Sequence, residues 1–170
     1  MTEASREVGV VVRRRSIDNP WIDQLWSPAM ILGEVPSTAP WTVLSTEGDA
    51  TTYYAGAASI DLFSAETANY RDNLAEGAPR IWVALRRQDG GAELELTKVT
   101  ADPTEGEALF ESGCEVIGTV PMPAEIASWI AAFVDRFHVE RVFHKRKRDR
   151  ARDDRPRVPG GGPDDGTGRR

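Results

Sequence analysis

The chain of 170 residues has little of what most metal-binding and catalytic chemistry requires. A single cysteine, Cys114, excludes an internal disulfide framework and a structural zinc site built on several cysteines. Only two histidines are present, His138 and His144, so a Cys114–histidine pair is the one nucleophile–base arrangement left open. We therefore expect no metal site, and the sequence identifies no catalytic residue.

Long apolar runs and glycine-rich phosphate loops are also missing. No uninterrupted apolar stretch approaches the roughly 18 residues that a transmembrane helix needs. The first 15 residues lack the apolar segment of a secretory signal. Neither Gly-x-x-x-x-Gly-Lys-Ser/Thr nor Gly-x-Gly-x-x-Gly occurs between a strand and a helix. These absences predict a cytoplasmic protein without a membrane span, a nucleotide-binding fold or a resident cofactor. They favour a non-enzymatic role and leave an enzymatic one open.

Charge is distributed unevenly along the chain. Residues 141–170 contain eleven Lys or Arg and five Asp or Glu, whereas residues 1–140 contain ten basic and twenty-two acidic residues. The body is therefore acidic and the C-terminal segment basic. Residues 156–170 are rich in Pro, Gly and Asp and offer almost nothing to bury, which predicts a disordered tail.

Short apolar stretches with β-branched or alternating residues predict about seven strands, separated by Gly, Pro, Asn and Asp. The predicted strands cover residues 8–12, 29–35, 41–44, 51–55 with a continuation at 59–63, 79–86, 93–99 and 115–120. The Asp89-Gly90-Gly91 turn favours a hairpin between two of them. Most strands are therefore expected to pair antiparallel.

Three helices are expected, over Ala65–Glu76, Thr104–Glu111 and Pro123–Phe137. The last is amphipathic, with six large apolar residues at helical spacing: Ile126, Trp129, Ile130, Phe133, Val134 and Phe137. The sequence thus predicts an α+β fold, in which a curled, mostly antiparallel sheet packs against a C-terminal amphipathic helix. We expect one domain over residues 1–143 and a tail over 144–170.

Arginines and tryptophans near the N-terminus form the most distinctive local cluster: Arg13, Arg14, Arg15, Trp21 and Trp26. Guanidinium groups beside indoles can bind phosphate or stack on a planar ligand. The alternative is a strand with solvated arginines beside a loop held by two packed indoles. Both interpretations stay open at the level of sequence.

A second cluster lies in the basic segment and contains Lys145, Arg146, Lys147 and Arg148. It could dock on an acidic protein surface, follow a phosphate backbone or keep the chain soluble. No aromatic residues alternate with these cations for base stacking, and the acidic body would repel a polyanion. A protein partner is therefore favoured over nucleic acid.

Several of these motifs also carry a family resemblance. They include Arg13-Arg14 with Asn19-Pro20-Trp21 and Trp26, Tyr70-Arg71-Asp72-Asn73-Leu74, Pro79-Arg80-Ile81-Trp82-Val83-Ala84-Leu85-Arg86, Val120-Pro121-Met122-Pro123 with Trp129 and Phe133-Val134, and Lys145-Arg146-Lys147-Arg148. In order and spacing they resemble an uncharacterised bacterial group, domain-of-unknown-function family 3305. The resemblance covers roughly residues 7–148.

The resemblance implies a context without a mechanism. Genes of this family typically lie beside those for formate dehydrogenase subunits, ferredoxin-like iron–sulfur proteins and a maturation chaperone. The resemblance thus favours a non-catalytic accessory protein that assists assembly or maturation of a molybdenum-dependent formate dehydrogenase. The alternative is a protein that binds a small anionic cofactor or nucleotide, related to molybdopterin, through the Arg/Trp cluster.

Overall fold

A computed structural model describes residues 3–88 and 93–139. The strands are β1 (Ala4–Ser16), β2 (Gln24–Leu32), β3 (Thr42–Glu47), β4 (Ala50–Leu62), β5 (Arg80–Arg87), β6 (Leu94–Thr100) and β7 (Val116–Pro121). The helices are α1 (Thr67–Ala75), which follows a short 3₁₀ turn, α2 (Pro103–Leu109) and α3 (Ala124–Phe137). The predicted turn at residues 89–91 and the predicted tail at 144–170 lie outside the described residues.

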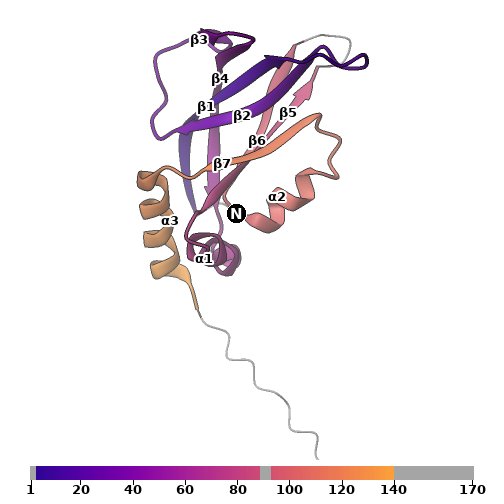
Figure 1. Ribbon diagram of the computed structural model, residues 1–170. Coiled ribbons are helices and arrows are strands. Elements are labelled where there is room, and N and C mark those ends of the chain that lie inside the picture. Colours follow the sequence, from indigo (N-terminus) through magenta and orange to yellow (C-terminus); the bar gives the residue numbers. More distant parts are fainter. Residues whose placement is uncertain (1–2, 89–92, 140–170) are drawn as a thin grey trace, which may run out of the picture. The chain divides into compact units, whose positions relative to one another are not determined.

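The seven strands form two antiparallel sheets, one in the order β2-β1-β4-β3 and the other in the order β6-β5-β7. The α+β class and the seven antiparallel strands are thus confirmed. The strands divide between two sheets, however, and do not form the single curled sheet that we expected. β2 lies beside β7, and β4 lies beside β6 (Figure 1).

A proline lies where β2 and β7 meet without forming a ladder. Pro28 lies in β2, and a proline has no N–H group to donate to a neighbouring strand. Its ring instead faces Gly118 of β7, where an added Cβ would lie 3.0 Å from Pro28 Cδ. The two sheets therefore meet here by close side-chain packing.

The core fills the space between the sheets. Side chains alternate between the two faces of a strand, and Val8, Val10 and Val12 of β1 point to the face that is fully buried. From the other sheet, Ile81, Val83 and Leu85 of β5 complete the core and are 0% exposed. Burying each such side chain contributes about 1.5–3 kcal/mol.

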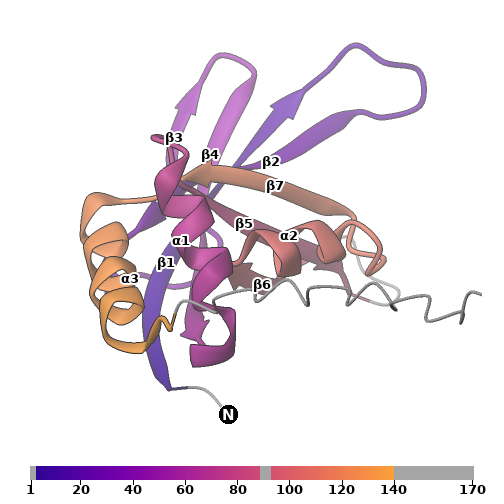
Figure 2. The same cartoon turned by 90° about the horizontal axis from the view of Figure 1, so that it is seen from below.

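The three helices lie at one end of the molecule, which we call the helical end, and Figure 2 views the molecule from it. α3 buries Ile126, Ile130, Phe133 and Val134. α1 and α3 pack together, and the ring centroids of Tyr70 and Phe133 are 6.2 Å apart. The opposite end, which we call the hairpin end, carries residues 13–26 of the β1–β2 hairpin and residues 41–53 around the β3–β4 hairpin (Figure 1).

The four strands of the first sheet, β1 to β4, are longer than the apolar pattern indicates. β1 continues past its valines to Ser16, because β2 and β4 flank it on both sides and complete its backbone hydrogen bonds. β2 begins at Gln24, so Trp26 lies within a strand and not in a loop. β3 begins at Thr42, one residue after its predicted start.

Candidate functional site

Arg14 lies on the face of β1 that points to the core, beyond the last buried valine on that face. It follows the buried Val10 and Val12 at two-residue spacing and therefore points to the same face of the sheet. Arg14 lies opposite Trp26 of β2, and Tyr53 of β4 lies opposite Val12. Because cross-strand neighbours share a face, the sheet places one arginine and two aromatic rings side by side at the hairpin end.

The Arg14 guanidinium lies over both rings. Its central carbon is 5.7 Å from the centroid of Trp26 and 5.3 Å from that of Tyr53. Both distances fall within the range of about 6 Å that characterises cation–π contacts. Within residues 3–88 and 93–139, Arg14 forms no hydrogen bond or ion pair. The rings therefore hold the guanidinium plane, while its N–H groups remain available to a ligand.

Trp41 provides the third aromatic wall through an unusual backbone conformation. Its φ angle is 67°, in the left-handed region that few residues other than glycine adopt. The Trp41 N–H donates to the carbonyl of Tyr54, which fixes this conformation on β4. The Trp41 ring centroid lies 5.9 Å from that of Trp26, edge to face, and 6.2 Å from that of Tyr53. Such local strain is frequent at binding sites.

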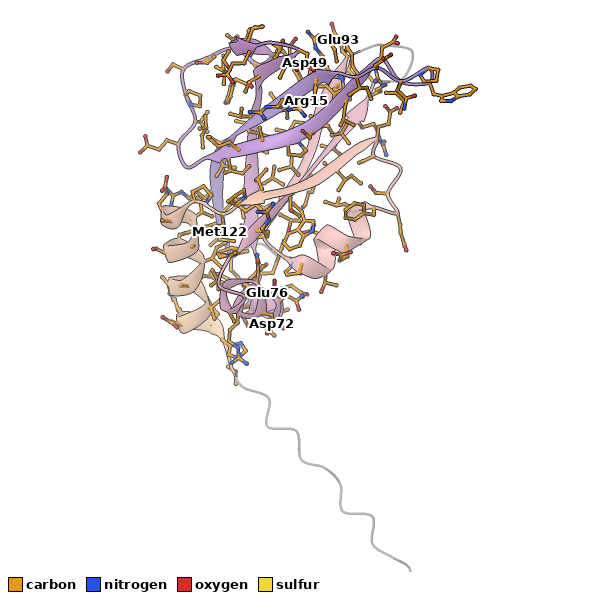
Figure 3. All side chains as sticks on the ribbon, viewed as in Figure 1. Arg15, Asp49, Asp72, Glu76, Glu93 and Met122 are labelled. Carbon is orange, nitrogen blue, oxygen red and sulfur yellow. The ribbon has the colours of Figure 1, made fainter. Side chains whose placement is uncertain are left out.

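These side chains surround a cavity of about 290 Å³. Its lining consists of Arg14, Trp26, Trp41, Tyr53, Glu93 and Leu94. Leu94 begins β6, in the second sheet, and Glu93 directly precedes it. Figure 3 shows Glu93 at the same end of the molecule as Arg15 and Asp49. The cavity thus joins both sheets at the hairpin end and contains one cation, one carboxylate and three aromatic rings.

Of the five residues predicted for the N-terminal cluster, the structure brings Arg14 and Trp26 together. Arg13 and Arg15 are exposed and alternate to the opposite face of β1. Trp21 lies in the β1–β2 turn and is 90% exposed. The predicted tail cluster lies outside the described residues: Lys145, Arg146, Lys147 and Arg148.

Sequence reasoning missed four residues that line the cavity, namely Trp41, Tyr53, Glu93 and Leu94. Side chains alternate between the two faces of a strand, and this alternation from Val10 onward could have placed Arg14 on the opposite face from Arg13 and Arg15. No local signal places Trp41 or Glu93, because each reaches the cavity through tertiary packing of distant segments.

Polar groups at the helical end have a structural role. The buried Asn73 of α1 donates to the carbonyls of Arg80 at 2.8 Å and Ala101 at 2.9 Å, and its Oδ1 accepts from the Arg80 N–H at 3.0 Å. It thereby ties α1 to the start of β5 and the end of β6. Tyr70 accepts a hydrogen bond from the Phe63 N–H at 3.1 Å, and its burial raises its pKa to about 12. The Tyr70–Leu74 motif is therefore explained by folding.

The Cys114–histidine pair finds no support in the described part of the chain. His138 follows α3 and bonds through Nδ1 to Thr67 Oγ1 at 3.1 Å and through Nε2 to Arg71 Nη1 at 3.0 Å. An arginine N–H only donates, so Nε2 is the acceptor and Nδ1 carries the proton. His138 thus connects α3 with α1. Among the described residues, no three His, Cys, Asp or Glu side chains are grouped to hold a metal ion.

Large apolar side chains are exposed at the hairpin end. Trp21, Ile22 and Leu25 of the β1–β2 hairpin are 90%, 51% and 52% exposed, and Val43 and Leu44 of β3 are 53% and 49% exposed. Single exposed apolar residues are ordinary, whereas a concentration of them at one end is typical of an interaction surface.

Comparison with known proteins identifies one family. The sequence profile of the family described as "protein of unknown function (DUF3305)" matches residues 7–147. The searches of curated proteins and of solved structures gave no match. No helix in the described ranges is long and apolar enough to cross a membrane. Since the profile covers most of the chain, the protein belongs to the DUF3305 family.

Proposed function

We propose that this protein is a non-catalytic accessory protein that binds a protein partner through its hairpin end. The observation that carries the proposal is the exposure of Trp21, Ile22, Leu25, Val43 and Leu44 on two neighbouring hairpins. Exposed aromatic and aliphatic side chains that are buried on association supply most of the free energy of many protein interfaces. Trp26 of β2 and Tyr53 of β4 lie on strands of these two hairpins, and their ring centroids are 5.5 Å apart.

The family resemblance supports one class of partner. A protein encoded beside formate dehydrogenase genes is expected to act on that enzyme or on its maturation factors. We therefore propose that the partner is a molybdenum-dependent formate dehydrogenase or a factor that matures it, and that the activity of this chain is to assist assembly.

A pull-down with the purified formate dehydrogenase of the same organism tests this proposal. The full chain should capture the enzyme, and the combined variant Trp21→Ser, Ile22→Ser, Leu25→Ser should lose most of that capture. The matched control is Phe110→Ser, which removes a 58% exposed apolar side chain after α2. Equal capture by the triple variant and the wild type would contradict the role of the hairpin end.

Deletion of the gene supplies the functional arm of the test. Formate dehydrogenase activity should fall while the amount of its transcript stays constant, because assembly acts after transcription. Unchanged activity in the deletion strain would remove the assembly role.

A second function is favoured by one specific observation. Arg14 is held by two rings and has no polar partner among the described residues, which is the state of an arginine ready to bind an anion. We therefore also propose that the cavity binds a small compound with an acidic group. Its volume of about 290 Å³ lies at the lower end of small-molecule sites, which favours a single-ring compound over a dinucleotide.

A further inference from the structure

We propose that the cavity between Arg14 and Glu93 binds a small zwitterion, an α-amino acid with an apolar side chain or an equivalent amine carboxylate. This inference rests on the second proposed function and specifies its ligand. It follows from the charges, the walls and the size of one cavity.

Arg14 provides the site for the acidic group. A guanidinium presents its N–H donors in a rigid plane that matches the two oxygens of a carboxylate. Stacking on Trp26 and Tyr53 holds this plane before a ligand arrives, which lowers the entropy lost on binding. The carboxylate of an amino acid can therefore accept two hydrogen bonds from Arg14 without rearranging the cavity.

Glu93 provides the site for the ammonium group. It lines the same cavity as Arg14, yet the two side chains do not form an ion pair with each other. A simple anion in the cavity would be repelled by Glu93, and a simple cation would be repelled by Arg14. A compound that carries both charges satisfies both side chains, so the pair selects a zwitterion over either single charge.

The remaining walls select the body of the ligand. Trp26, Trp41, Tyr53 and Leu94 present rings and an aliphatic side chain, which favour contact with an apolar group. Aromatic faces also attract an ammonium ion. An apolar amino acid therefore matches the charges and the lining together.

Intrinsic tryptophan fluorescence of the full chain tests the proposal, because two of the walls are indoles. The probes are phenylalanine and leucine, which carry both charges, and 3-phenylpropionate, 2-phenylethylamine and inorganic phosphate, which carry one sign each. Excitation at the red edge of the indole band avoids absorption by the probes. Phenylalanine should bind at least about tenfold more tightly than either of its single-charge analogues, since each analogue leaves one charged side chain without its partner.

Substitutions separate the two contacts. Arg14→Gln should weaken binding of phenylalanine and 3-phenylpropionate by about tenfold or more and leave 2-phenylethylamine unaffected or improved. Glu93→Gln should weaken phenylalanine and 2-phenylethylamine instead, and it changes an exposed side chain that folding does not require. Arg13→Gln, on the opposite face of the same strand, is the matched control and should bind every probe as the wild type does.

The outcomes distinguish this inference from the function on which it rests. If 3-phenylpropionate or phosphate binds as tightly as phenylalanine, the cavity is a general anion site and the zwitterion inference is overturned. If no probe changes the fluorescence at concentrations up to roughly 10 mM, the binding free energy of every probe is weaker than about −3 kcal/mol. Both the inference and the anion-binding function are then overturned.

Discussion

In the part of the chain that the structure describes, the buried polar side chains of the helical end are hydrogen-bonded, whereas at the hairpin end an arginine lines a cavity and several large apolar side chains are exposed. Asp102 caps α2 by accepting from the Thr104 N–H at 2.8 Å, and Thr100 donates to Glu105 at 2.6 Å. No buried side-chain nitrogen or oxygen in the described ranges lacks a hydrogen-bond partner. By contrast, the Arg14 N–H groups have no hydrogen-bond or ion-pair partner among the described residues, and the Trp21 side chain is 90% exposed. On the proposal made above, the helical end supports the fold and the hairpin end binds other molecules.

The largest effect is expected from Ile130→Ala in α3. Ile130 is 0% exposed, so its truncation removes buried methyl groups and leaves a cavity. The free energy of unfolding should fall by about 2–5 kcal/mol, as measured by urea denaturation. Leu25→Ala, which shortens a 52% exposed aliphatic side chain at the hairpin end, should change the same quantity by less than about 0.5 kcal/mol. An equal fall in the free energy of unfolding for both variants would contradict the distinction between a structural helical end and an exposed hairpin end.

Asn73→Ala should follow closely in size. It removes three hydrogen bonds, to the N–H and the carbonyl of Arg80, which are partly buried, and to the buried carbonyl of Ala101. We expect a loss of about 2–4 kcal/mol in the free energy of unfolding, because each unsatisfied buried group costs about 1–3 kcal/mol and water can reach some of them. Asn19→Ala is the control, since Asn19 is exposed and accepts a hydrogen bond from the Trp21 N–H. A loss below that of the control would mean that α1 is not tied to the sheet through Asn73.

The raised pKa of Tyr70 predicts that the stability of the helical end depends on pH. Its pKa rises from 10.0 to about 12 in the folded chain, mainly through burial. A raised folded-state pKa stabilises the fold below pH 10.0, and this contribution is lost as the pH rises toward 12. Melting temperatures measured between these pH values should fall less steeply for Tyr70→Phe than for the wild type. Parallel curves for the two proteins would contradict the burial of this hydroxyl group.

The smallest effect on stability is expected from Trp21→Ser. The side chain is 90% exposed and buries almost nothing in the isolated chain, so the melting temperature should stay within a degree or two. Thermal unfolding followed by circular dichroism measures it. A sharp decrease would show that Trp21 packs within the fold and is not reserved for a partner.

Local pattern predicted most of the elements, because apolar periodicity and capping residues act within a few positions. The α+β class, the seven antiparallel strands and the end of α3 at Phe137 follow from such signals. The division into two sheets does not, since it depends on contacts between strands that are distant in the sequence, such as that of Pro28 with Gly118.

The candidate site was predicted only in part, for a similar reason. Arg14 and Trp26 lie within a short span of sequence, and their pairing in β1 and β2 is local. Tyr53 joins them only through the register of β4, where an extra residue shifts the pairing between Val10 and Val11. Trp41 needs a left-handed backbone conformation that its residue type does not signal.

Amide hydrogen exchange of the full chain, with and without purified formate dehydrogenase, tests most directly that the hairpin end is the end that binds. We predict that the enzyme slows amide exchange in residues 17–25 and 42–47, which contain the exposed apolar side chains. The exchange rates in α1 and α3 should stay unchanged. Slower exchange confined to α1 and α3, with the two hairpins unaffected, would contradict it.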